Sequence, residues 1–320
     1  MNRIIKNFTG SLLNWYMDHG RKDLPWQTPY HPYSVWVSEI MLQQTQVKTV
    51  IPYFLRFMAR FPDIHTLAAA PLEEVFALWS GLGYYSRARH LHQCAQLIVT
   101  QLQGVFPKEV TTLKNLPGIG PSTAAAIASL AFDQPTAILD GNVKRVLSRY
   151  FLVKGQGISL EKTLWPLAQA CMPNQQCREY TQAIMDMGAT CCTLKNPQCN
   201  ICPLNSQCQA FQKQMVGQYP ESKPKKIRAT HHEQFVVLHD ADHHIYLEQR
   251  PLKGIWGGLW CLPSIEKEAC MSTFLQQGHG IYAAEITPLM TFNHSFTHFH
   301  LNIHAYQVFV PHPCSSLGTW

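Results

Sequence analysis

Charged side chains are scarce in this sequence, and long apolar runs are absent from it. Only 14% of the 320 residues are Asp, Glu, Lys or Arg, against about 25% in an average protein, which argues against a disordered chain. No stretch approaches the roughly 18 apolar residues of a membrane-spanning helix. The N-terminal segment lacks the basic, apolar and small-residue pattern of a signal peptide. We therefore expect a folded cytoplasmic protein that contacts no membrane.

Hydrophobic residues and cysteines, in contrast, are plentiful. Hydrophobic residues make up 46% of the chain, which is enough for real cores, and the length favours two domains. The net charge of +6 favours a polyanionic partner. Because thiols stay reduced in the cytoplasm, the eleven cysteines indicate metal ligation before disulfides.

Residues 1–214 are expected to be helical. Apolar residues recur at three- and four-residue spacing in LAAAPLEEVFALW (67–79) and in STAAAIASLAF (122–132). Proline and glycine divide such segments at short intervals. The pattern predicts a compact all-α domain of many short helices.

The composition and the spacing of apolar residues change after residue 214. Residues 215–232 have prolines and no apolar period, which predicts a basic linker that is either a solvated connector or a strip along a phosphate backbone. Residues 233–320 alternate as β-strands do, with a hairpin around 240–242 and a long strand within 298–310. We expect a small α/β domain there. The cationic residues of the linker are Lys223, Lys225, Lys226 and Arg228.

Four cysteines at short spacing indicate a metal centre. Their pattern is C-x6-C-x2-C-x5-C, formed by Cys192, Cys199, Cys202 and Cys208. Such soft thiolate ligands select zinc or an iron–sulfur cluster, and their chemistry leaves both open. Cys191 adjoins the first ligand and offers an alternative thiolate. The other cysteines are expected to be packing residues.

A glycine-rich turn runs into an alanine-rich helix at LPGIGPSTAAAI (116–127). Gly118 and Gly120 leave backbone N–H groups uncovered, and the N-terminus of the following helix favours an anion. The turn is therefore either an ordinary interhelical connection or a site for a phosphate group. A phosphate contact supplies affinity and no base specificity.

Two carboxylates are candidates for acid–base chemistry. Asp140 follows an apolar run and precedes a predicted helix, which is typical of an N-cap and also of a buried functional carboxylate. On one helix through residues 33–54, Glu39 shares a polar face with Gln43 and Gln46. A polar stripe among core residues predicts a cleft, where desolvation raises the pKa of a carboxyl group.

Together these motifs resemble the MutY family of adenine DNA glycosylases, within the endonuclease III or helix–hairpin–helix superfamily. The resemblance covers most of residues 10–310 and implies a helix–hairpin–helix at 112–132, a [4Fe–4S] cluster on loop 192–208 and a Nudix-like domain at 233–320. Its spacing chooses Cys192 over Cys191. The implied activity is removal of adenine mispaired with 8-oxoguanine or guanine in double-stranded DNA. The matching segments are LPWQ (24–27), WVSEIMLQQTQV (36–47), GLGYYSRAR (81–89), LPGIGPSTA (116–124), LDGNVKR (139–145) and the four-cysteine loop.

The family assigns roles to matching residues. Glu39 is expected to protonate adenine and handle the attacking water, Asp140 to stabilise the sugar cation, and Asn142 to orient its neighbour. Lyases of the superfamily place a nucleophilic lysine where this chain has Ser122, so the resemblance implies a monofunctional enzyme. A lyase and a non-catalytic iron–sulfur DNA-binding protein remain the alternatives. The residues expected to hold DNA or replace the flipped base are Gln43, Gln44, Leu82, Tyr84, Gly118, Gly120, Ser122 and Lys144.

Family members read 8-oxoguanine with a Phe-Ser-His loop, for which this sequence has Phe296, Thr297 and His298. Thr297 keeps the hydroxyl and adds a methyl group. The Nudix catalytic signature is absent, so hydrolysis of nucleoside triphosphates is not expected. The sequence stops at Trp320, where relatives usually continue into a final helix, so we expect a shortened recognition domain. We expect a monomer associated with the nucleoid, and repair or replication partners by family analogy alone.

Overall fold

The computed structural model describes residues 2–221, 227–282, 285–311 and 318–319. The chain divides into two compact units, Met1–Lys223 and Pro224–Trp320. Lys223, Lys225 and Lys226 of the expected linker, and Cys314, lie outside the described residues. Among the residues described, no helix has the length and apolarity that crossing a membrane requires.

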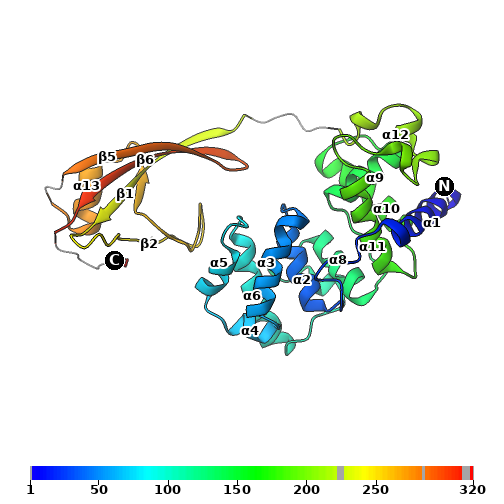
Figure 1. Ribbon diagram of the computed structural model, residues 1–320, viewed down its shortest axis with the longest axis horizontal. Coiled ribbons are helices and arrows are strands. Elements are labelled where there is room, and N and C mark those ends of the chain that lie inside the picture. Colours follow the sequence, from blue (N-terminus) through cyan, green and yellow to red (C-terminus); the bar gives the residue numbers. More distant parts are fainter. Residues whose placement is uncertain (1, 222–226, 283–284, 312–317, 320) are drawn as a thin grey trace. The chain divides into compact units, whose positions relative to one another are not determined.

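The first unit is helical (Figure 1). Its short elements follow from the frequent prolines and glycines, which end helices. The α-helices are α1 (Asn2–His19), α2 (Pro32–Leu42), α3 (Val47–Arg60), α4 (Ile64–Ala69), α5 (Leu72–Trp79), α6 (Ser86–Leu102), α7 (Val110–Leu113), α8 (Pro121–Phe132), α9 (Gly141–Phe151), α10 (Gly157–Cys171), α11 (Cys177–Asp186) and α12 (Gln209–Gln212). The π-helix η1 (Met187–Cys191) and the 3-10 helices η2 (Cys199–Ile201), η3 (Asn205–Gln207) and η4 (Val216–Gln218) complete the unit.

The helices of the first unit form two groups that share α8. In one group α2 packs against α3 and α6, and α6 packs against α4 and α5. In the other, α1 from the start of the chain packs against α10 and α11 (Figure 1). Because α8 contacts both α2 and α11, it joins the groups and places the glycine-rich turn before it between them.

A proline divides the apolar segment 67–79 into two helices. The structure has α4 and α5 there, with Pro71 as the N-cap of α5. Proline has no N–H to continue the hydrogen bonds of the preceding helix, and it favours extended backbone in the residue before it. Ala70 accordingly adopts φ −71°, ψ 149°.

The second unit is a small sheet with one helix. Four strands have the order β4-β1-β6-β5, in which β1 and β6 are parallel and the other pairs antiparallel. Helix α13 (Met271–His279) covers part of one face, where Leu275 packs with Val236 and Val308. The strands are β1 (Ala229–His239), β2 (Glu248–Gln249), β3 (Trp260–Cys261), β4 (Ser264–Glu266), β5 (Ile286–Ser295) and β6 (Phe299–Phe309).

The long strand expected within 298–310 is present as β6. The hairpin expected around 240–242 has a turn but no second strand paired along β1. Beyond the turn only an isolated bridge joins His239 to Ile245, and β2 pairs with β3 instead. The carboxylate of Asp240 accepts hydrogen bonds from the backbone N–H of Asp242 and of His244, at 2.9 and 2.8 Å. These local bonds compete with the ladder.

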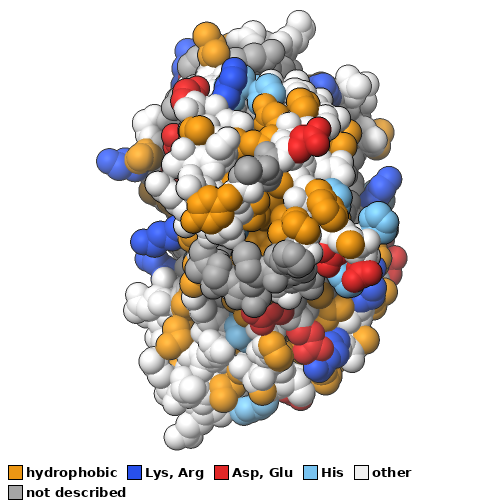
Figure 2. Space-filling view, turned by 90° about the vertical axis from the view of Figure 1, so that its left-hand side faces the viewer, with side chains coloured by type: hydrophobic (Ala, Val, Ile, Leu, Met, Phe, Trp, Pro, Cys, Tyr) orange, Lys and Arg blue, Asp and Glu red, His pale blue; other side chains and the backbone are white. Residues whose placement is uncertain are grey.

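Apolar side chains remain accessible on this unit. A hollow of about 360 Å³ is lined by the rings of Phe235, Trp256, Trp260 and Phe292. Figure 2 shows hydrophobic side chains gathered in the middle of one face of the molecule. A patch of this kind is a common feature of surfaces that bind other molecules.

Two glycine substitutions are expected to change stability in opposite directions. A Cβ on Gly188 in η1 would lie 2.5 Å from Cβ of Asn142, whereas a Cβ on Gly10 in α1 would meet nothing within 4 Å. Gly188→Ala should therefore destabilise the protein by about 1–3 kcal/mol through overpacking. Gly10→Ala should stabilise it by about 1 kcal/mol through helix propensity. Urea unfolding followed by circular dichroism checks both, and equal effects would contradict the close packing of η1 on α9.

Candidate active site

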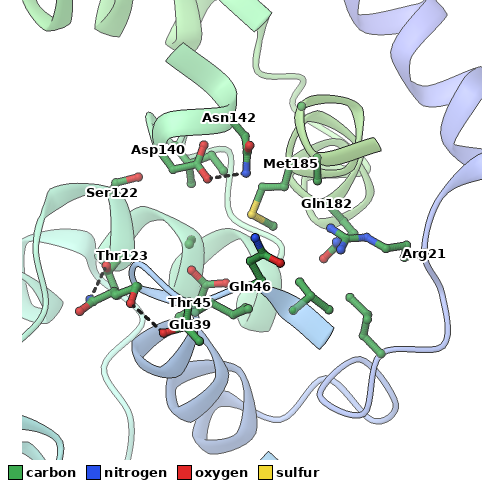
Figure 3. Close-up of a pocket in the computed structure, with 18 of the residues that line it drawn as sticks. Arg21, Glu39, Thr45, Gln46, Ser122, Thr123, Asp140, Asn142, Gln182 and Met185 are labelled. Atoms are coloured by element: carbon green, nitrogen blue, oxygen red, sulfur yellow. Dashed lines mark hydrogen bonds between the residues drawn. The ribbon is translucent and has the colours of Figure 1, made fainter. Parts of the chain in front are cut away.

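A cavity of about 660 Å³ opens between the two groups of helices in the first unit. Its wall comes from α2, the 43–46 turn, the start of α8, the loop before α9, α11 and η1. Glu39 and Asp140 both line it, and Figure 3 shows them on opposite sides of it, with Asn142 beside Asp140. The structure thus brings together all three residues for which the sequence predicts a catalytic role.

The carboxyl group of Glu39 is enclosed in the last turn of α2, next to the buried side chains of Ile40 and Met41. The residue keeps some accessible surface and lines the cavity. Burial raises the pKa of Glu39 to about 8, and the charge of Asp140 adds to the rise. At neutral pH the group is therefore mostly protonated and able to donate a proton.

Asp140 is the N-cap of α9. Its Oδ1 accepts a hydrogen bond of 2.7 Å from the backbone N–H of Val143, and Nδ2 of Asn142 donates to its Oδ2 at 3.4 Å. Burial raises the pKa of Asp140, while these donors and the charge of Arg145 lower it. Asp140 is thus both a helix cap and an enclosed carboxylate, and its partners favour the charged form.

Arg145 sets the orientation of Asn142. Its Nη2 donates to Oδ1 of Asn142 at 2.8 Å and to the carbonyl oxygen of Gly188 at 2.6 Å. Its Nε donates to the carbonyl oxygen of Cys192 at 2.7 Å. Because the amide oxygen of Asn142 accepts from Arg145, the amide Nδ2 faces Asp140. One guanidinium group therefore connects α9, η1 and the cysteine loop.

The prediction of one helix through residues 33–54 is wrong. Helix α2 ends at Leu42 and α3 begins at Val47, so Glu39, Gln43 and Gln46 do not share one helix face. Gln43 has ψ 112° and Gln44 has φ 60°, which breaks the helix. The turn nevertheless returns Gln43 and Gln46 to the cavity wall, so the cleft inferred from the stripe exists for a different reason.

The glycine-rich turn closes against this broken helix. Gly118 has φ 77°, and a Cβ there would lie 2.9 Å from Cβ of His90. Nε2 of Gln43 donates to the carbonyl oxygen of Gly118 at 3.4 Å and to Oγ1 of Thr123 at 3.3 Å. Ser122 lines the cavity, and its hydroxyl oxygen accepts a hydrogen bond of 3.1 Å from the backbone N–H of Leu139.

The other residues expected to contact DNA do not line the cavity. Leu82 and Tyr84 lie between α5 and α6, where Leu82 is buried and Tyr84 is 42% exposed with φ 50°. Nζ of Lys144 lies 2.5 Å from Oε1 of Glu161 in a surface ion pair. Gln44 is exposed. Positive φ in Gln44 and Tyr84 is uncommon for residues other than glycine and is frequent at functional sites.

The residues on one wall of the cavity were not predicted from the sequence. Gln182 and Arg21 line it, and both bind the buried carboxylate of Asp186. Oδ1 of Asp186 accepts from Nε2 of Gln182 at 2.8 Å and from Nη2 of Arg21 at 2.6 Å. Gln182 and Asp186 are four residues apart among apolar neighbours, which is the same spacing as that of Glu39 and Gln43.

The five neighbouring cysteine thiols surround a small hollow that also contacts Arg149. Nη1 of Arg149 donates to Sγ of Cys192 at 3.3 Å and to the carbonyl oxygen of Thr193 at 2.7 Å. A cation at a sulfur favours the thiolate form, and a donor set of sulfur alone suits iron–sulfur or zinc chemistry. Sγ of Cys191 donates to the carbonyl oxygen of Gln198 at 3.7 Å. The residues present therefore fit a thiolate-bound metal centre.

In the second unit, residues 296–298 form the turn between β5 and β6. The ring of Phe296 stacks on that of Phe299, with centroids 4.6 Å apart, and its backbone N–H donates to the carbonyl oxygen of Phe299 at 2.9 Å. Thr297 and His298 are exposed. The turn is anchored by the phenylalanine, and it presents a hydroxyl and an imidazole at the end of the sheet.

Comparison with known proteins follows the same division of the chain. Residues 37–169 match the HhH-GPD superfamily of base excision DNA repair proteins, and residues 234–319 match the NUDIX domain. The adenine DNA glycosylase of Buchnera aphidicola subsp. Baizongia pistaciae (strain Bp) is 41% identical over 92% of this chain and 84% of that protein. The chain belongs to the adenine DNA glycosylase family. The human adenine DNA glycosylase is 34% identical over 93% of this chain and 66% of that protein.

Solved structures agree with the family in fold. A thermostable thymine-DNA glycosylase superposes with a TM-score of 0.60 at 29% identity, over 66% of this chain and 98% of that one. A non-covalent endonuclease III–DNA complex gives 0.57 at 23% identity and shares the fold. The expected fold class, a helix–hairpin–helix glycosylase domain followed by a Nudix-like domain, is confirmed. The expected enzyme class, adenine DNA glycosylase, is confirmed as well, with DNA as the partner.

The raised pKa of Glu39 predicts a stability effect. The folded value near 8 exceeds the ordinary value of 4.5, so the folded protein keeps a proton that the unfolded chain loses. Stability therefore falls as pH rises through this window. Glu39→Gln should remove that loss and raise the melting temperature more at about pH 8 than at about pH 5. The exposed Glu109→Gln should show no such dependence, and a pH-independent gain for Glu39→Gln would contradict the raised pKa.

Proposed function

We propose that this chain removes adenine paired with 8-oxoguanine or guanine by hydrolysing the N-glycosidic bond and leaving the strand intact. The observation that carries the proposal is the pair of enclosed carboxyl groups in one cavity: burial raises the pKa of both, and hydrogen-bond donors with the charge of Arg145 oppose the rise at Asp140. Glycosidic hydrolysis needs an acid for the leaving base and a negative charge for the sugar cation. The cavity of about 660 Å³ has the size of a typical ligand site and accommodates a flipped base.

In the proposed reaction Glu39 donates its proton to N7 of adenine. The bond between the sugar C1′ and the base N9 then breaks, and its electron pair leaves with the base. Asp140 stabilises the resulting oxocarbenium ion, with its position fixed by Val143 and Asn142. Water attacks C1′ and returns a proton to Glu39, which restores the acid.

The position at which lyases of the superfamily carry their nucleophilic lysine has no amine in this chain. Position 122 carries a hydroxyl, which already accepts from the N–H of Leu139. Lys144, the nearby lysine in the motif, is paired with Glu161. Neither group supplies a free amine for a Schiff base, which supports a monofunctional glycosylase.

We assign the DNA contacts to three places. The turn containing Gly118 and Gly120 takes a backbone phosphate through its N–H groups. Gln43, Gln44, Leu82 and Tyr84 fill the space that the flipped adenine leaves. Phe296, Thr297 and His298 read the opposite 8-oxoguanine, with Thr297 offering its hydroxyl as a hydrogen-bond partner.

A [4Fe–4S] cluster is the proposed occupant of the cysteine hollow. Cys192, Cys199, Cys202 and Cys208 would hold it as thiolates, with Arg149 next to Cys192. When bound, such a cluster cross-links the loop and adds folding free energy. The cluster takes no part in the glycosidic step proposed above.

The proposed function predicts strand breakage only after alkali. A duplex with one adenine opposite 8-oxoguanine is incubated with wild type, Glu39→Gln or Asp140→Asn, and breakage is compared with and without alkali. Wild type should give an alkali-dependent break, and each variant should lose at least about 100-fold in rate, because each removes a different catalytic group. Breakage without alkali would support the lyase. DNA binding without base loss would support the non-catalytic alternative.

The cluster assignment predicts different effects for adjacent cysteines. Cys192→Ser should lower the iron content and the visible charge-transfer absorption of the purified protein, because serine is a poor ligand for iron. Cys191→Ser is the matched control and should keep both, since its thiol is assigned to packing. Loss in Cys191→Ser alone would reverse the assignment, and zinc in the wild type without iron would exclude the cluster.

A further inference from the structure

Arg87 is a buried cation, 7% exposed, beside the cavity described above. It projects from the first turn of α6 toward two loops that are about forty residues apart in sequence. Its two terminal nitrogens bind backbone carbonyl oxygens of both loops. Nη1 donates to the carbonyl oxygens of Ile40, Met41 and Gln43 at 3.0, 2.8 and 2.6 Å. Nη2 donates to the carbonyl oxygens of Leu82 and Gly83 at 3.2 Å each, and to Oγ1 of Thr45 at 3.3 Å.

Arg87 binds the free C-terminal end of α2. The last carbonyl oxygens of a helix have no partner within it, and the C-terminal end attracts positive charge. Arg87 supplies donors to Ile40 and Met41, and its own charge is met by carbonyl dipoles. In the described ranges of the chain no carboxylate forms a salt bridge with it. Burial lowers the pKa of Arg87 to about 10, so the guanidinium is charged at neutral pH.

Both loops carry the residues that we assign to filling the duplex. Gln44 in the first has φ 60° and Tyr84 in the second has φ 50°, so each loop presents a side chain from an uncommon backbone conformation. The guanidinium carbon of Arg87 lies 5.5 Å from the ring centroid of Tyr84. Glu39 immediately precedes Ile40, whose carbonyl oxygen Arg87 holds. A shift of one loop would thus change both its distance from the other and the position of the acid.

We infer that Arg87 is a positioning residue for base flipping: it locks the 43–46 turn and the 81–84 loop into one rigid wedge that enters the duplex together. This inference rests on the proposed function. A planar guanidinium with several fixed donors serves two loops at once. Lysine keeps the charge but has one ammonium group with three donors at a single point, so it holds only one of the loops.

The test uses the full chain and a duplex with the fluorescent base 2-aminopurine opposite 8-oxoguanine. Fluorescence rises when the base leaves the stack, which reports flipping apart from bond cleavage. In Arg87→Lys the flipping rate and the single-turnover excision of adenine should both fall by at least about tenfold, as small misplacements at a site do. Binding to undamaged duplex and the shape of the pH–rate profile should be unchanged, because neither the phosphate contacts nor Glu39 is replaced.

Two further variants serve as controls for flipping and for excision. Glu39→Gln should flip the base at the wild-type rate without excising it, and Arg60→Lys, at an exposed arginine of α3 that pairs with Glu74, should match wild type in both assays. Normal flipping by Arg87→Lys would overturn the inference, whether or not excision falls. If instead wild type flips but does not excise adenine, the proposed function fails while the flipping comparison still decides the role of Arg87.

If Arg87→Lys is markedly less stable than wild type, hydrogen exchange distinguishes a positioning role from a general stability role. A positioning role requires faster amide exchange confined to residues 40–46 and 80–86, because those segments lose the shared donor. Faster exchange throughout the helical unit would show a general stability role and overturn the inference.

Discussion

Two carboxyl groups share one cavity, and the hydrogen-bond donors around it lie at only one of them. Glu39 receives no hydrogen bond from the described residues that would favour its charged form, so burial dominates and its pKa rises to about 8. Burial also raises the pKa of Asp140, but the N–H of Val143, the amide of Asn142 and the charge of Arg145 oppose that rise. The division of labour between acid and anion therefore follows from where hydrogen-bond donors lie.

Helix ends supply both environments. Asp140 begins α9, where unpaired backbone N–H groups favour negative charge. Glu39 lies in the last turn of α2, where the free groups are carbonyl oxygens, and Arg87 binds those oxygens instead of the carboxyl group. The cation at this helix end thus binds the backbone, and no salt bridge to Glu39 is formed by the described residues. The opposite kinds of helix terminus thus give Asp140 the hydrogen-bond donors that Glu39 lacks.

Features that depend on neighbouring residues could be read from the sequence, and features that depend on distant ones could not. The cysteine spacing, the glycine-rich turn and the cap at Asp140 are local patterns, and the structure has each of them where it was expected. The expected helix through 33–54 failed because the backbone breaks at Gln43 and Gln44, where the free carbonyl oxygens of α2 are bound by Arg87, more than forty positions away. Gln182 and Arg21 were missed for a related reason: they become part of the site only through Asp186, which α11 brings to the N-terminal segment.

A short segment of chain connects the cysteine loop to the residues around Asp140. Between Asp186, which anchors Gln182, and Cys192 runs only the π-helix η1. Gly188 within it packs against Asn142 with no room for a Cβ, and Arg145 binds Gly188, Cys192 and Asn142 at once. A displacement of Cys192 must therefore move either Arg145 or η1, and both lead to Asn142 and so to Asp140. An ordered cysteine loop is consequently a geometric requirement of the anion site, even though no electron passes between them in the proposed reaction.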